Sequence, residues 1–275
     1  MRSQSSHPRL RAAAAVCAAV AVVGPAPAAA RAAPAPAAPA DALLAPSPDP
    51  FDGLTPERIA DRAVDATRSA DSLRMTGKMV TDGQKLDVDF SVDDRGSCTG
   101  RIGIDDGTAE LRRLDGITYM KGDEAFWRLS MTSQGVPENQ IGPVIELVEG
   151  RWLKIAPGQT GSSDLSEVCD LDSLLDGLGD DRREGLTRGP DREVDGTPVA
   201  TLVQKEPAGD GTDRTETTTV SVAQEGKPYI RQVVRTGGDE SGTVTLSDYD
   251  RPVKVTAPPA DETVDLSRLD PGTRA

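Results

Sequence analysis

The sequence predicts one domain of the α+β class, built from two antiparallel meanders with helices before and between them. Residues 85–94, KLDVDFSVDD, alternate polar and apolar side chains, which indicates a strand with one wet and one dry face. Turn signals such as Asp-Gly recur at short intervals on both sides of this stretch. Three stretches have helical spacing instead. The resulting order of helix, meander, helices and meander is typical of an α+β domain.

The domain is expected to span residues 51–267 and to begin with an amphipathic helix. Thr55 can cap this helix, Pro56 suits its first position, and Glu57 favours the positive end of the helix dipole. The apolar face is thin and consists of Ile59, Ala63, Ala66 and Ala70. This helix therefore brings little apolar volume to a sheet that packs on it.

The first meander has turns at residues 82–83, 94–96, 106–107 and 115–116. Between these turns, side chains of one parity are apolar or small and belong on one face. They are Leu73, Met75, Gly77 and Met79 in one segment, Leu86, Val88, Phe90 and Val92 in the next, and Cys98, Gly100, Ile102 and Ile104 in the third.

The middle of the chain changes to helical spacing. Residues 137–149 predict a helix that starts late because of Pro143, and RWLKI at 151–155 predicts a short strand. Residues 162–181 predict a clearer helix, with Leu165, Val168, Leu171, Leu175 and Leu178 on its apolar face. After residue 183 four more strand-like segments form the second meander.

The N-terminal 30 residues have the features of a secretory signal peptide, with a basic start, a short apolar core and small residues before the expected cleavage site. Residues 31–50 are rich in Ala and Pro and predict a linker, and residues 268–275 predict a flexible tail. We therefore expect a secreted or extracytoplasmic envelope protein. Lipid anchoring at Cys17 is the alternative, but Val16 precedes this cysteine and the apolar run continues beyond it.

Composition excludes several functions. The chain has a net charge of −14; removal of residues 1–30 takes away three of 31 basic residues, which leaves 28 − 45 = −17. Such a surface repels nucleic acid. The single histidine, His7, lies in the expected signal, so the mature chain lacks histidine for catalysis or zinc binding. No cofactor and no enzymatic activity are expected, although carboxylate-based hydrolysis is a third alternative.

The acidic segment at residues 170–177, DLDSLLDG, partly resembles a calcium-binding loop. A calcium-binding loop needs an acid or amide at its fifth place and Gly at its sixth. Here these places hold Leu174 and Leu175, so we predict no metal site.

The apolar face of the two meanders must be shielded from water by other groups. Aromatic residues make up only 3% of the chain, and the first helix presents mainly alanines. Either the sheet packs tightly on its small helices, or it leaves a cavity that an apolar ligand can enter. The residues by themselves leave both alternatives open.

Four segments, in this order, resemble the LppX/LprG-type lipoproteins of actinobacteria (LppX_LprAFG). These segments are ADSLRMTGKM, ITYMKGDEAFW, GRWLKI and LSDYDRPVKVTAPPADETVDL, and the resemblance covers residues 52–267. The family is similar in fold to LolA, LolB and RseB. The resemblance implies a strongly curved antiparallel sheet, a half-barrel, wrapped over a few helices around a hydrophobic cavity for acyl chains. The chain departs from the family in lacking a convincing anchor cysteine.

From this resemblance we expect a monomeric, non-catalytic carrier that binds a lipid or another acylated ligand. An RseB-like sensor that regulates an envelope membrane protein is the alternative. The residues expected to line the cavity are Met75, Met79, Leu86, Val88, Phe90, Ile102, Ile104, Tyr119 and Trp127.

Cys98 and Cys169 are the only cysteines outside the expected signal. Because the chain is expected to be exported, we predict a disulfide bond between them, with free buried thiols as the alternative. This bond would attach the third predicted helix to the first meander.

Overall fold

The computed structural model describes residues 49–81, 83–159, 162–176, 185–207 and 214–266. All of them belong to one compact unit that begins at Ser47. The expected signal peptide, nearly all of the expected linker and the expected C-terminal tail lie outside the described residues, and so does Leu178.

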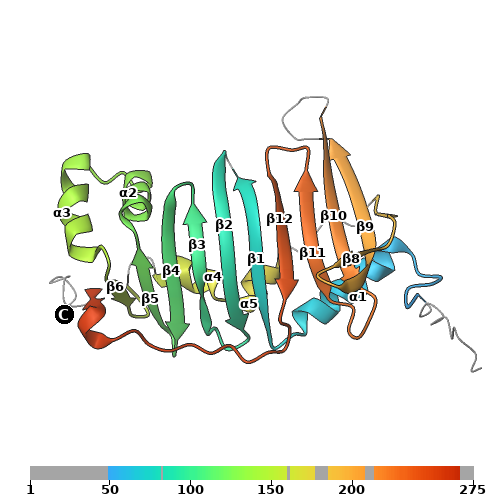
Figure 1. Ribbon diagram of the computed structural model, residues 1–275, viewed down its shortest axis with the longest axis horizontal. Helices are drawn as coiled ribbons and strands as arrows, with labels where there is room; N and C mark the ends of the chain where they lie inside the picture. The colour runs from blue at the N-terminus through green and yellow to red at the C-terminus, as the bar shows by residue number, and fades with distance from the viewer. Residues whose placement is uncertain (1–48, 82, 160–161, 177–184, 208–213, 267–275) are drawn as a thin grey trace, which may run out of the picture. The chain divides into compact units, whose positions relative to one another are not determined.

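A single sheet of thirteen strands dominates the described part of the chain (Figure 1). The strands are β1 Ser72–Thr81, β2 Gln84–Asp93, β3 Cys98–Ile104, β4 Gly107–Leu114, β5 Ile117–Gly122, β6 Trp152–Ile155, β7 Thr187–Arg188, β8 Arg192–Val194, β9 Thr197–Pro207, β10 Thr215–Ala223, β11 Ile230–Thr236, β12 Ser241–Ser247 and β13 Thr263–Asp265. Their order across the sheet is β13-β6-β5-β4-β3-β2-β1-β12-β11-β10-β9-β7, and β8 also pairs with β9.

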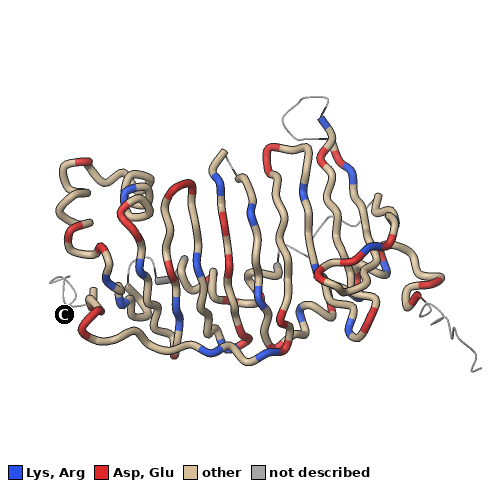
Figure 2. The backbone as a smooth tube through the Cα atoms, viewed as in Figure 1, with Lys and Arg blue, Asp and Glu red and all other residues tan. Residues whose placement is uncertain are grey.

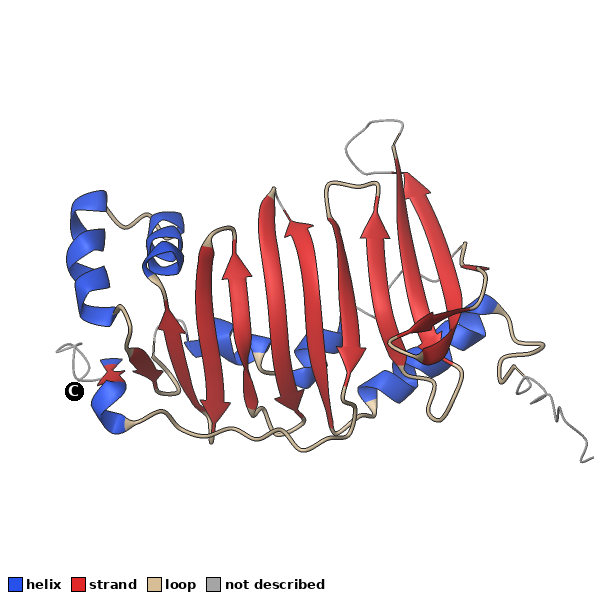
Figure 3. Ribbon diagram, viewed as in Figure 1, coloured by secondary structure: helices blue, strands red, loops and turns tan. Residues whose placement is uncertain are grey.

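The two meanders join through the pairing of β1 with β12 (Figure 3). Neighbouring strands are antiparallel except for the short parallel pair of β6 and β13. The described helices are α1 Pro56–Arg68, α2 Glu124–Ser133, α3 Glu138–Val148, α4 Ser162–Val168, α5 Leu171–Asp176 and the 3₁₀ helix Ala260–Glu262. This curved, unclosed sheet over a few helices confirms the predicted α+β half-barrel.

The strand register separates an apolar inner face from a polar outer face. One inner row passes through directly paired residues on β12, β1, β2, β3, β4 and β5, namely Leu246, Met75, Phe90, Gly100, Leu111 and Met120. The neighbouring outer row consists of Thr76, Asp89, Arg101, Glu110 and Lys121. Figure 2 shows acidic and basic residues along the strands, and Figure 1 shows α4 and α5 behind the sheet.

Helix α1 forms where the capping pattern predicts it. The Thr55 hydroxyl accepts a hydrogen bond from the Arg58 amide at 3.4 Å. Ile59 and Ala63 are buried, and α1 contacts β10 and β11. The hydroxyl of Thr67 accepts a hydrogen bond from the amide of Ile230 at 3.0 Å, which fixes the helix to the start of β11.

Helix α2 was not predicted from the sequence. The Asp123 carboxylate starts this helix, because it accepts hydrogen bonds from the amides of Phe126 at 2.8 Å and Thr108 at 2.9 Å. The side chain thus caps α2 and ties it to β4. Four described segments form α-helices in the region between the meanders, where we expected two.

The other two expected helices are also corrected in detail. α3 begins at Glu138 and contains Pro143, so the prediction of a late start was wrong. The helix expected over residues 162–181 is interrupted at Cys169 and Asp170, which separates α4 from α5. Asp170 accepts hydrogen bonds from the amide and hydroxyl of Ser173, both at 2.8 Å, so it caps the new helix α5.

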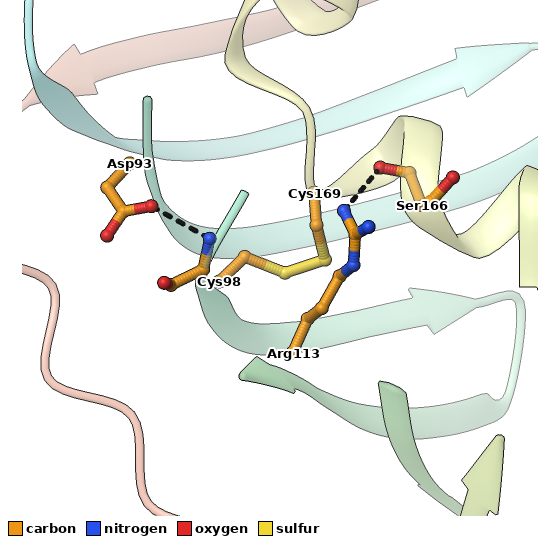
Figure 4. The surroundings of a disulfide bond; sticks show 6 residues. Asp93, Cys98, Arg113, Ser166 and Cys169 are labelled. Atoms are coloured by element: carbon orange, nitrogen blue, oxygen red, sulfur yellow. Dashed lines mark hydrogen bonds between the residues drawn. A yellow bond between two sulfur atoms is a disulfide. The ribbon is translucent and has the colours of Figure 1, made fainter. Parts of the chain in front are cut away.

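The predicted disulfide bond is confirmed and joins Cys98 at the start of β3 to Cys169 between α4 and α5 (Figure 4). The two Cα atoms are 5.3 Å apart and both residues are fully buried. Beside the bond, Arg113 donates a hydrogen bond to the Ser166 carbonyl at 3.3 Å. The α4–α5 pair is therefore attached to the inner face at the Cys98 end of β3.

A C-terminal strap, residues 248–262, runs from β12 along the ends of the strands to β13 (Figure 1). The Ser72 hydroxyl donates to the Arg251 carbonyl at 2.6 Å, and Arg112 donates to the Thr256 carbonyl at 3.3 Å. Lys154 pairs with Asp265 at 3.0 Å where the strap has become β13. The strap thus connects the middle of the sheet to its β6 edge.

Asp250 attaches the beginning of the strap. Its carboxylate accepts hydrogen bonds from Tyr229 at 2.6 Å, from Lys227 at 2.9 Å and from the amide of Asp71 at 3.1 Å. The hydrogen bonds from Tyr229 and Lys227 stabilise the charged form and lower the pKa of Asp250 to about 2. The aromatic rings of Tyr229 and Tyr249 stack beside this group, with centroids 3.9 Å apart.

We expect Asp250→Asn to destabilise the protein at neutral pH and to have little effect near pH 2. The folded pKa of about 2 lies below the unfolded value of about 3.9, so the stabilisation is complete above the unfolded pKa and lost as pH falls through the folded one. Urea unfolding of both proteins at several pH values measures the difference. Lys227→Gln keeps the carboxylate but removes its cationic partner, so the free energy of unfolding of this variant should depend less on pH than that of the parent protein. A difference for Asp250→Asn that is independent of pH would contradict this account.

Candidate functional site

The inner face carries an open apolar stripe, a band of apolar side chains that are only partly buried and pack on the core. Its members are Met75, Met79, Leu86, Ile102, Ile104, Val220, Val233 and Val244. Strand pairing brings them together in adjoining rows, since Val220 pairs with Val233 and Val233 pairs with Val244. In the next row Leu86 lies between Met79 and Ile104.

The stripe crosses six neighbouring strands, from β10 to β3. Five inter-strand spacings of about 4.8 Å give it a length of about 24 Å. One leaflet of a bilayer, half of a hydrocarbon core about 30 Å thick, is about 15 Å deep. The stripe is therefore long enough for one acyl chain laid across the strands.

The helices cover one end of the strands and leave the stripe at the other. On β3, Cys98 at the covered end is fully buried, whereas Ile102 and Ile104 toward the other end are partly exposed. On β1 and β2 the paired residues Leu73 and Val92 are likewise buried at the end that carries the disulfide. The disulfide thus determines which part of the apolar face is covered by α4 and α5.

Helix α2 closes the β4–β5 end of the inner face. Gly122 allows this close approach, because a Cβ atom there would lie 2.6 Å from the Phe126 ring and 2.9 Å from the Trp127 ring. The indole N–H of Trp127 donates to the Gly122 carbonyl at 3.0 Å. Both aromatic side chains are buried and meet edge to face, with centroids 5.3 Å apart. This end of the stripe is apolar.

The β10–β11 end is polar. Arg235 lies two residues after Val233 on β11 and therefore on the same inner face. Its Nε atom lies 3.2 Å from a carboxylate oxygen of Glu216. Its Nη1 atom also pairs with the Glu240 carboxylate. The Arg235 side chain is 27% exposed, so this charged group is at the rim of the stripe and not beneath it.

The structure places most of the predicted cavity residues near the stripe. Met75, Met79, Leu86, Ile102 and Ile104 belong to it. Val88 and Phe90 are 8% and 5% exposed, so they form its floor. Trp127 lies in α2 at the apolar end and not on a strand.

Tyr119 is not part of the stripe. Pairing places it between Arg112 and Lys154 on the outer face, because its neighbours Thr118 and Met120 are the inward residues of β5. The sequence interpretation also missed the three stripe valines of the second meander. Alternation in residues 215–223 and 230–236 was the available signal, but it did not show which valines would stay uncovered.

The outer face carries cross-strand ion pairs between Arg74 and Asp89 at 2.8 Å and between Lys78 and Asp87 at 3.0 Å. The hydrogen bonds from Arg74 lower the pKa of Asp89. Positively and negatively charged side chains alternate here and pair with one another, which is typical of a solvent-exposed surface. Within the described ranges, no three His, Cys, Asp or Glu side chains are grouped closely enough to hold a metal ion. In the same ranges, each helix is too short or too polar to span a membrane.

Comparisons with known proteins agree with this architecture. No protein-family model and no curated protein sequence matches the chain. Among solved structures, LprF from Mycobacterium bovis aligns with a TM-score of 0.51 and 14% sequence identity over 74% of this chain and 96% of LprF. At this identity the likeness shows the fold, which is the one expected from the resemblance to LppX/LprG-type lipoproteins.

Two further structures are similar at lower TM-scores. The Mycobacterium tuberculosis lipoprotein LppX aligns with a TM-score of 0.45 and 18% identity over 73% of this chain and 98% of LppX. MucB of Pseudomonas aeruginosa, in its complex with MucA, aligns with a TM-score of 0.30 and 12% identity over 75% of this chain and 59% of that structure.

Proposed function

We propose that this protein binds a lipid or another acylated ligand along the open apolar stripe and acts as a non-catalytic carrier outside the cytoplasm. The observation that carries the proposal is the stripe itself. Its eight apolar side chains lie in register across six strands and are only partly covered by the helices. A contiguous apolar surface of this kind marks a binding site on a soluble domain.

Burial of acyl methylene groups provides the binding free energy. Each methylene group removed from water contributes about 0.8 kcal/mol, so ten of them contribute about 8 kcal/mol before the cost of immobilising the ligand. Apolar contact has little directional preference, so chains of different length and branching should bind. The Met75 and Met79 side chains support such breadth, because methionine adapts to irregular surfaces.

The strongest test compares two adjacent valines on β11. Val233 faces the stripe, whereas Val234 is paired with Thr219 and Thr243 on the outer face. Both are partly buried, so Val→Asp should change strand stability similarly at the two positions. Only Val233→Asp places a carboxylate against a bound acyl chain, where its desolvation is costly.

We expect Val233→Asp to weaken acyl-chain binding at least about tenfold and Val234→Asp to leave it nearly unchanged. Native mass spectrometry of protein from its own host measures co-purified lipid, and titration with an uncharged apolar dye measures affinity. Melting temperatures check that both variants are folded. Equal binding by the two variants would contradict a site on the inner face. A parent protein without lipid and without dye binding would favour the sensor alternative.

A further inference from the structure

A charged clip, Arg235 with Glu216 and Glu240, stands at the β10–β11 end of the open apolar stripe. In the register Arg235 is paired with Gly242, and Gly242 is paired with Met79. Gly242 lets the two strands approach closely at this point, since a Cβ atom there would lie 2.6 Å from the Met79 Cβ. A hollow of about 190 Å³ lies there, lined by both residues and by the stripe valines Val233 and Val244. The clip and the stripe thus share one continuous surface.

The two carboxylates hold the guanidinium group in a defined orientation. Nε lies 3.2 Å from Glu216, and Nη1 pairs with Glu240. In the described part of the chain these contacts use Nε and Nη1, which leaves the two N–H groups of Nη2 without a protein acceptor. A guanidinium group has five N–H donors, so Arg235 retains donors for a ligand atom.

The two ends of the stripe differ in polarity. Phe126 and Trp127 make the α2 end apolar, whereas the Arg235 end offers hydrogen-bond donors. A bound acyl chain therefore has one favourable direction, with its tail toward α2 and its polar end at the clip. Apolar contact along the stripe would not select a direction on its own.

The sign of the local charge limits what the polar end can be. Two carboxylates and one guanidinium give the clip a net charge of −1, on a chain whose net charge is already −14. A free carboxylate or phosphate would be repelled by Glu216 and Glu240. The carbonyl oxygen of an ester or amide accepts a hydrogen bond from Nη2 without this repulsion.

On the basis of the proposed function, we propose that the Arg235 clip binds the ester or amide carbonyl at the polar end of a neutral acyl lipid and excludes free fatty acids. Arg235 positions the ligand, and Glu216 and Glu240 determine its specificity. The stripe supplies affinity for the chain, whereas the clip distinguishes among lipids that have the same chain.

The test displaces an uncharged apolar dye with two ligands of equal chain length, palmitate and 1-monopalmitoylglycerol, at pH 8 and at submicellar concentrations. We expect the parent protein to bind 1-monopalmitoylglycerol about tenfold more tightly than palmitate. The double variant Glu216→Gln/Glu240→Gln should reduce this preference to threefold or less. A matched control, Asp87→Asn/Glu110→Gln, removes the same charge from the outer face and should keep the preference.

Arg235→Gln provides a second readout that does not depend on the acidic residues being replaced. This variant should weaken 1-monopalmitoylglycerol binding several-fold and leave palmitate binding low. Equal affinity of the parent protein for the two ligands would overturn the proposal, and so would an equal loss of preference in the outer-face control. If neither ligand displaces the dye, or the dye does not bind, the proposed function fails as well. If both ligands displace the dye with equal affinity, the clip proposal alone fails and acyl binding along the stripe still stands.

Discussion

Replacing both Cys98 and Cys169 by alanine should lower the free energy of unfolding by about 4 kcal/mol. The disulfide closes a loop with a sequence separation of 71 residues, so its loss gives the unfolded chain much more conformational freedom. In the folded state the bond holds the α4–α5 junction on β3, with the Arg113–Ser166 hydrogen bond beside it. The double variant should therefore also loosen the two short helices.

Urea unfolding with and without a reducing agent measures this effect. The parent protein in reducing agent should approach the double variant, whereas the variant itself should not respond to the reducing agent. Both cysteines are fully buried, so alkylation of the folded parent should be slow before reduction. A difference below 1 kcal/mol between parent and variant would mean that the α4–α5 pair is held by packing alone.

Replacing Phe90 by alanine should lower the free energy of unfolding by about 3–5 kcal/mol. Phe90 is 5% exposed at the floor of the stripe, and the residue paired with it on β3 is Gly100. A Cβ atom at Gly100 would lie 2.7 Å from the Phe90 Cα, so glycine makes room for the phenylalanine. Truncation therefore leaves a cavity opposite a residue of β3 that has no side chain to fill it.

Ser91→Ala provides the matched control for Phe90→Ala. Ser91 is the next residue of β2 and pairs with Arg74 and Thr99 on the outer face, so this change should alter stability by less than about 0.5 kcal/mol. Equilibrium unfolding in urea and the melting temperature measure both variants. A loss below 1 kcal/mol for Phe90→Ala would show that the floor of the stripe is loosely packed.

The inner and outer faces of the first meander could be predicted from the sequence. On β2 strict alternation separates Leu86 and Phe90 from Asp87 and Asp89, and a slip by one residue would bury carboxylates. Turn chemistry was equally informative, because Gly116 adopts a φ of 78° that suits glycine. Both signals act within a few residues of the chain, so they can be read without the tertiary structure.

The outward position of Tyr119 could not be predicted from the local sequence pattern. On β5 the apolar side chains Ile117 and Met120 fall on opposite parities, so alternation does not identify the inward face. The pairing of Met120 with Leu111 decides it, and this pairing depends on β4. Helix α2 depends in the same way on a neighbour, because the Asp123 carboxylate caps it while also bonding to Thr108.

The sequence by itself determined the α+β class, the alternation that gives the sheet one apolar face, and the two cysteines available for a disulfide outside the expected signal. Only the tertiary structure decided which part of that face stays open. The attachment of Cys169 to Cys98 covers the Cys98 end of the face, and α2, packed on Gly122, closes its β4–β5 end. The register of β10–β12 then adds the three valines and Arg235 to the remaining stripe. Covering and register are contacts between segments far apart in the chain, so no local pattern specifies them.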